Sequence, residues 1–155
     1  MNSPLQDYKV FPRHVGAWEG SVRVLDADLQ QIKQYKIAQQ FKQAADRWIL
    51  INTFIFADGN SMTHTFDIIP TGRGEVVVKT EEPSLKTAKM DAIEHGDSII
   101  DFKLFSPETG RLTEIETINL ISDRERFRTT QLFNEKGEFK GLLVVTEHKV
   151  ESAAS

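Results

Sequence analysis

The ten residues that decide the fold are Phe11-Pro12-Arg13-His14-Val15-Gly16-Ala17-Trp18-Glu19-Gly20. They lead into the first strand-like segment of the chain and contain the pattern Gly-x-Trp-x-Gly. Glycines around a large aromatic side chain in a strand mark a place where another backbone or a ligand comes close. The indole of Trp18 is large enough to close one end of a β-barrel, with its N–H bonded to a nearby acceptor. The segment indicates a closed barrel rather than a particular chemistry.

The rest of the chain alternates between apolar and polar residues with a period of two, and helical periodicity is nearly absent. Turn signals such as Asp58-Gly59 and Glu135-Lys136-Gly137 separate the alternating segments. This pattern predicts about ten strands at regular spacing. Their expected bounds are Trp18–Asp26, Gln31–Lys42, Arg47–Ala57, Ser61–Ile69, Glu75–Glu82, Lys86–Glu94, Ser98–Phe105, Leu112–Ile121, Arg126–Asn134 and Phe139–Val150.

Strands joined by short hairpins form an antiparallel meander, and such a sheet tends to close because closure removes its exposed edges. The predicted fold class is therefore all-β, with a single antiparallel up-and-down barrel of about eight to ten strands over residues 1–155. Residues 1–10 are expected to form an N-terminal extension, and residues 151–155 a disordered tail. A barrel of this size can enclose one small ligand.

Composition excludes several classes of function. The 155 residues include no cysteine, so neither a disulfide framework nor thiolate chemistry is available. The 19 basic and 23 acidic residues are interspersed along the chain, which argues against a nucleic-acid partner. The N-terminus lacks a signal-peptide pattern, and no apolar run is long enough to span a bilayer. We expect a soluble, cytoplasmic protein with no membrane span, and a homodimer stays open.

The pair Gly16-x-Trp18 resembles the signature of the lipocalin and broader calycin superfamily. In that superfamily an arginine on the last strands packs across the tryptophan, and Arg126 and Arg128 stand where this partner is expected. The resemblance implies that Gly16, Trp18 and Arg126 form a structural signature at the closed end of the barrel. It also implies an apolar internal cavity, without a shared catalytic apparatus.

A narrower resemblance is to an uncharacterised lipocalin-like family common in photosynthetic microbes. Because secreted lipocalins usually carry disulfides, the chain looks closer to intracellular calycins such as fatty-acid-binding and nitrobindin-like barrels. Three segments carry the narrower resemblance: Phe11–Gly20, Asn52–Phe66 and Arg126–Val150.

His64 is the titratable residue that the pattern places most clearly inside the barrel, because it shares a strand face with Met62, Phe66 and Ile68. There it could act as a general base, a haem ligand or a hydrogen-bond anchor for a ligand. The alternative is a core histidine bonded to a neighbouring strand.

Glu114 and Glu116 share one strand face, but the sequence leaves open whether that face is interior or exterior. Inside the barrel their pKa values would rise and suit acid–base chemistry, with Arg126 or Arg128 as a possible partner and ligand anchor. We favour a solvated pair on the exterior, because buried carboxylates are rare without a partner.

The cavity is expected to have adaptable apolar walls, with small residues such as Ala88 and Ala92 leaving room for a ligand. The alternative is a barrel that fills itself with side chains. The predicted ligand-binding residues are Phe54, Phe66, Met90, Phe102, Leu104, Arg128, Gln131 and Phe133.

No metal site or cofactor is predicted. The four histidines, His14, His64, His95 and His148, are scattered without short ligand spacings. A haem bound by His148, as in nitrobindin-like barrels, is a weak alternative because the surrounding pattern is missing.

Three functions fit this sequence. The first is a binding protein for a small, largely apolar molecule, which is aromatic, isoprenoid or fatty. The second is a cofactor-free cyclase or isomerase of specialised (natural-product) metabolism, in which His64, Glu116 and Tyr35 would be catalytic and move a proton while the cavity holds one conformer. The third is a scaffold that uses the outer surface of the barrel.

Overall fold

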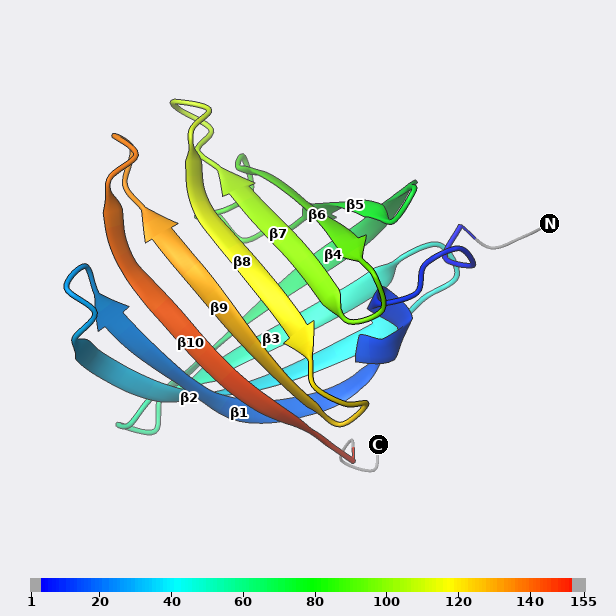
Figure 1. Cartoon of the computed structure of the whole chain (residues 1–155), viewed down its shortest axis with the longest axis horizontal. Coiled ribbons are helices and arrows are strands. Elements are labelled where there is room, and N and C mark those ends of the chain that lie inside the picture. The colour runs from blue at the N-terminus through cyan, green and yellow to red at the C-terminus, as the bar shows by residue number, and fades with distance from the viewer. Residues whose placement is uncertain (1–3, 152–155) are drawn as a thin grey trace.

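Ten strands follow one another along residues 4–151, the part of the chain that the computed structural model describes. A short 3-10 helix precedes them (Figure 1). The elements are η1 (Phe11–His14), β1 (Gly16–Asp26), β2 (Gln31–Gln43), β3 (Trp48–Ile55), β4 (Ser61–Gly72), β5 (Glu75–Lys79), β6 (Lys89–His95), β7 (Ile99–Phe105), β8 (Leu112–Leu120), β9 (Glu125–Phe133) and β10 (Phe139–Val150).

Each strand pairs with the next in an antiparallel ladder, and β1 pairs with β10 to close the sheet. Figure 1 shows the strands as one curved wall around a common interior. The predicted all-β up-and-down barrel is therefore confirmed. Among the described residues no helix is long and apolar enough to cross a membrane.

The main departure from the predicted strands lies between β5 and β6. Residues 80–88 leave the ladder, although the alternation predicted strands to Glu82 and from Lys86. The chain turns here because the Thr80 hydroxyl donates to the carbonyl of Thr65 and the amide of Leu85 donates to the carbonyl of Glu82. Pro83, which has no N–H to offer a ladder, lies inside this turn.

Gly20 explains the glycine pattern of the opening segment. A Cβ atom at this position would lie 1.9 Å from the backbone oxygen of Thr146 on β10. Any side chain would therefore push apart the two strands that close the barrel. The close approach expected around Trp18 is an approach of backbone, made where the first strand meets the last.

One end of the barrel is closed by the segment before β1. Figure 1 shows η1 lying against this end. The rings of Tyr8 and Phe11 lie 5.2 Å and 5.3 Å from the fully buried Trp48. The Glu94 carboxylate accepts hydrogen bonds from the amides of residues 9–11, at 2.7, 2.7 and 3.1 Å. Together these contacts pin the segment to the barrel, so the cavity has a solid floor.

Candidate ligand-binding cavity

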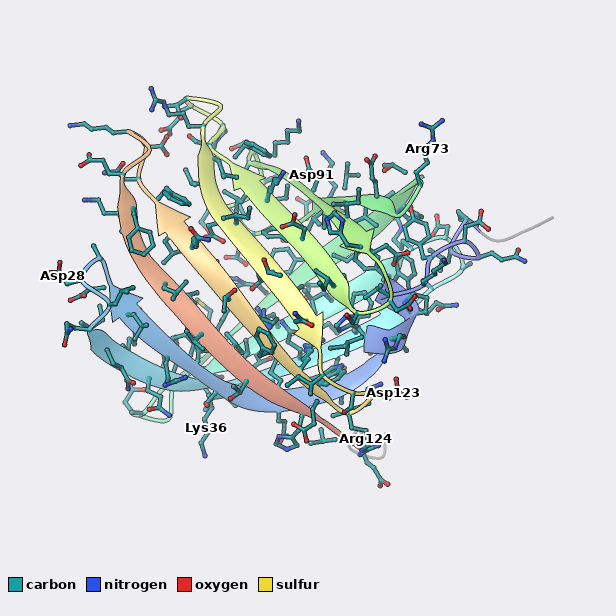
Figure 2. All side chains as sticks on the ribbon, viewed as in Figure 1. Asp28, Lys36, Arg73, Asp91, Asp123 and Arg124 are labelled. Atoms are coloured by element: carbon teal, nitrogen blue, oxygen red, sulfur yellow. The ribbon has the colours of Figure 1, made fainter. Side chains whose placement is uncertain are left out.

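The barrel encloses a cavity of about 350 Å³, lined by η1, by the β5–β6 connection and by every strand. This volume is at the lower end of the range of small-molecule sites. Charged side chains such as Asp28, Lys36, Arg73 and Arg124 point away from the barrel (Figure 2).

Strands β4 to β7 form an apolar wall of this cavity. Their inward-facing side chains alternate with outward-facing ones, as the period of two requires. The wall consists of Phe66, Ile68, Val76, Val78, Met90, Ala92, Ile100, Phe102 and Leu104.

The adjoining wall, on β8 to β10, is organised around Glu147, whose side chain has no exposed surface. Its carboxylate accepts hydrogen bonds from Nε of Arg126 and Nε of Arg128, each at 2.8 Å. Burial alone would raise the pKa of Glu147, but the charges of Arg128 and Arg126 and their hydrogen bonds outweigh it and lower the pKa to about 2. Glu147 is therefore ionised at neutral pH.

Arg126 links this wall to the floor of the cavity. Its guanidinium lies 4.1 Å from the ring centre of Trp18 and donates to Nδ1 of His14 at 2.8 Å. It also donates to Oε1 of Gln39, whose amide donates in turn to Asn52 at 3.3 Å. The structure thus brings the signature residues Trp18 and Arg126 into contact.

Glu114 and Glu116 both line the cavity, so the interpretation of a solvated exterior pair is wrong. The partners that make burial of Glu116 tolerable come from the neighbouring strand β9. Nη1 of Arg128 and the hydroxyl of Thr130 donate to Glu116 Oε2 at 3.1 Å and 2.9 Å. Glu114 has no such partner among the described residues, and burial together with the charge of Glu116 raises its pKa to about 7.

Replacing Glu114 by Gln is expected to raise the free energy of unfolding at about pH 8 by about 1–3 kcal/mol. The folded-state pKa of about 7 lies above the ordinary glutamate value of 4.5. The favourable contribution of the protonated carboxyl is therefore full below pH 4.5 and is lost as the pH rises through about 7. Urea unfolding of the variant and the wild type at about pH 5 and pH 8 measures this difference.

The matched variant replaces Glu116 by Gln, two residues along the same strand. It is expected to lower the free energy of unfolding at both pH values, because Arg128 loses a charged acceptor inside the barrel. Responses of the same sign at about pH 8 in the two variants would contradict the different environments described here.

His14 is a buried polar side chain of the cavity floor with one unpaired ring nitrogen. It is 3 % exposed, and burial and the charge of Arg126 hold the pKa of its imidazole well below the ordinary value. Its Nε2 atom has no hydrogen-bond partner within the described residues. A buried donor without a partner costs about 1–3 kcal/mol, so this atom is a point where a ligand could bind.

Most of the predicted site residues lie in the cavity. His64 lies there between the rings of Phe54 and Phe66, with Nε2 3.7 Å from a Glu82 oxygen. Burial raises the pKa of the Tyr35 hydroxyl. The predicted residues that line the cavity are Tyr35, Phe54, His64, Phe66, Met90, Phe102, Leu104, Glu116 and Arg128. No hydrogen bond within residues 4–151 joins any two of the three predicted catalytic residues.

Gln131 and Phe133 do not line the cavity, so their predicted role in ligand binding is wrong. Inward positions on β9 fall on even numbers, as Thr130 shows, and Gln131 is exposed. Phe133 packs instead against Phe139 at 6.1 Å. His148 is exposed too, so it cannot bind a haem inside the barrel.

Sequence reasoning missed the polar residues that organise this wall and floor. The sequence pattern alone assigns no role to Glu147, Gln39 or Asn52. His14 appeared only as one of four scattered histidines. The one available signal was the pair Arg126 and Arg128, since two inward-facing arginines require buried acceptors. Among residues 4–151 no three acidic or histidine side chains gather as metal ligands.

The closed barrel, the Trp18–Arg126 contact and the internal cavity define a lipocalin-like protein with a wall of paired charges. Residues 5–152 match the model of the family described as domain of unknown function DUF3598, N-terminal, and the chain belongs to this family. The resemblance to a lipocalin-like family is thereby confirmed.

Solved structures agree with this fold. A DUF3598 protein from Nostoc punctiforme is 22% identical with a TM-score of 0.67 over 90% of this chain and 49% of its own, so the chain spans about half the length of that protein. Rv2717c from M. tuberculosis is 13% identical with a TM-score of 0.69, over 97% of this chain and 99% of its own. The S-type phycobiliprotein lyase of Guillardia theta is 11% identical with a TM-score of 0.65, over 94% and 92%. No curated protein matches the chain.

Proposed function

We propose that the barrel binds a small, largely apolar molecule in its interior. The observation that carries this proposal is the cavity of about 350 Å³, whose wall on β4 to β7 is apolar and whose side chains Arg126, Arg128 and Glu116 are held in ion pairs. A ligand that buries roughly 200 Å² of apolar surface there gains about 5 kcal/mol from the hydrophobic effect. An aromatic, isoprenoid or fatty molecule has this chemistry.

Most of the charged side chains in the wall on β8 to β10 are paired with one another rather than left for a ligand. Glu147, Arg126 and Arg128 satisfy one another, and Glu116 is held by Arg128 and Thr130. The apolar side chains of β4 to β7 are left to contact the ligand. The similar solved structures support the barrel fold, and the identity of the ligand has to come from experiment.

The test is to fill the cavity from its apolar wall. Ala92 on β6 is 7% exposed and faces the cavity, so Ala92→Phe puts a ring into the space that a ligand needs. The uncharged fluorescent probe N-phenyl-1-naphthylamine is expected to bind the wild type with enhanced fluorescence. The expected loss of affinity in the variant is at least about tenfold, because overlapping volumes exclude each other.

The matched control is Ala38→Phe on β2, a position that faces outward between Glu19 and Thr53. It adds the same ring outside the cavity, so its probe affinity should equal that of the wild type. Equal affinity in all three proteins would place the probe outside the barrel and contradict the proposal.

Acid–base catalysis in the same cavity is a second candidate, and Glu114 favours it. A carboxyl group with a pKa of about 7 holds and releases a proton near neutral pH, as a general acid or base must. Glu116, the carboxyl expected to be catalytic, is tied to Arg128 and Thr130, so Glu114 fits this role better. Under this hypothesis, Glu114→Gln abolishes turnover of a bound substrate while binding persists; turnover that survives in the variant would exclude it.

A further inference from the structure

We infer that the ligand is an uncharged molecule whose polar end carries a carbonyl or ether oxygen, and that this oxygen accepts a hydrogen bond from Nε2–H of His14. The inference rests on the proposed binding function and names the chemical class of the ligand. It also assigns an orientation, with the polar end on the floor of the cavity and the apolar body along β4 to β7.

The donor on His14 follows from its partner. A guanidinium can only donate hydrogen bonds, so His14 Nδ1 must be the acceptor in its 2.8 Å contact with Nη1 of Arg126. A neutral imidazole that accepts at Nδ1 carries its proton at Nε2. This N–H is buried without a partner in the described part of the chain, on a side chain that lines the cavity. An acceptor that reaches this N–H from the cavity side would therefore be stabilised.

The position of His14 decides which end of the ligand it meets. His14 belongs to η1, which lies against the closed end of the barrel (Figure 1). Its backbone carbonyl accepts the indole N–H of Trp18 at 2.9 Å, so the residue is held from both its backbone and its ring. An oxygen bound there must be the deepest polar atom of the ligand.

The charge balance of the cavity selects against an ion. Arg126 and Arg128 face the carboxylates of Glu147 and Glu116, so two positive charges meet two negative charges, and Glu114, which also lines the cavity, is neutral below a pH of about 7. Each of the two guanidiniums already has a carboxylate partner, so neither requires an anionic ligand. A charged ligand would lose its hydration without gaining a counter-charge. A neutral acceptor satisfies His14 and leaves the paired charges intact.

Three probes with the same ring test this inference: 2-acetylnaphthalene has a neutral acceptor, 2-ethylnaphthalene has none, and 2-naphthoate is an anion. Calorimetric titration at about pH 6 keeps Glu114 largely protonated, so its charge does not bias the comparison. We expect the ketone to bind about tenfold more tightly than either of the other two probes, in keeping with one additional hydrogen bond.

Two variants of His14 separate its two roles, which are to donate a hydrogen bond to the ligand and to accept one from Arg126. In His14→Asn the side-chain oxygen can still accept from Arg126, but the shorter amide withdraws the donor from the cavity. In His14→Gln the amide nitrogen can reach the position of Nε2. The preference for the ketone should vanish in the Asn variant and persist in the Gln variant. Because each variant is compared across probes, a general loss of stability does not produce this pattern.

Equal binding of ketone and hydrocarbon to the wild type would overturn the inference while leaving the proposed binding function standing. A preference that survives in His14→Asn, or tightest binding of the naphthoate, would overturn it as well. Failure of all three probes to bind would contradict the proposed function itself, and the inference with it.

Discussion

Replacing Glu147 by Gln is expected to lower the free energy of unfolding by about 3–5 kcal/mol. The side chain of Glu147 has no exposed surface and bonds to both Arg126 and Arg128. Glutamine keeps the size of the side chain but removes its charge, so the buried Arg126 loses its carboxylate partner and Arg128 keeps only Glu116. Since a domain is stabilised by about 5–15 kcal/mol in total, this one change threatens the whole fold.

Urea unfolding followed by circular dichroism measures this loss. The matched control is Glu125→Gln on β9, where the glutamate is exposed, and its effect should stay within about 0.5 kcal/mol. An equally small effect of Glu147→Gln would contradict the role given to the buried carboxylate.

The same carboxylate also governs stability in acid. Its folded-state pKa of about 2 lies below the ordinary glutamate value of 4.5, so its contribution to stability is full above pH 4.5 and is lost as the pH falls through about 2. The wild type should therefore lose stability over this range more steeply than the Glu147→Gln variant.

Replacing Trp18 by Ala is expected to cost about 3–5 kcal/mol. Trp18 is fully buried, lies under the guanidinium of Arg126 and donates its indole N–H to the carbonyl of His14. Alanine leaves a void at the floor and removes the ring that covers Arg126. Urea unfolding followed by circular dichroism is the suitable measurement.

Trp18→Phe separates the ring from the indole N–H. The phenyl ring still covers Arg126, so the loss should be smaller than in Trp18→Ala, at about 1–2 kcal/mol. A Trp18→Ala variant as stable as Trp18→Phe would show that the void and the uncovered guanidinium contribute little, contrary to this account.

The barrel could be predicted because its determinants are local. Alternation along each strand places side chains such as Phe66 and Phe102 on the inner face, and turns such as Asp58-Gly59 fix where the chain reverses. The connection after Lys79 could not be predicted, because the side chain that bends it, Thr80, bonds to the distant Thr65. The alternation of residues along a single strand does not indicate contacts between distant residues.

The apolar half of the site follows from the same alternation, but the polar half does not. Arg126 meets Glu147 across 21 positions, Gln39 across 87 and His14 across 112. These pairings form only when the barrel closes, so the spacing of the residues in the sequence does not predict them. Phe133 was wrongly predicted to line the cavity, because an aromatic residue on a strand can also pack on the outer surface, as Phe133 does against Phe139.

The central claim is that the interior of this barrel holds a small apolar molecule. A crystal structure of the protein grown with N-phenyl-1-naphthylamine tests it most directly. The account predicts density for the probe inside the barrel, against Phe102 and Met90 on one side and within reach of Arg128 on the other. Side chains filling the interior, with the probe absent or bound only to the outer surface, would contradict it.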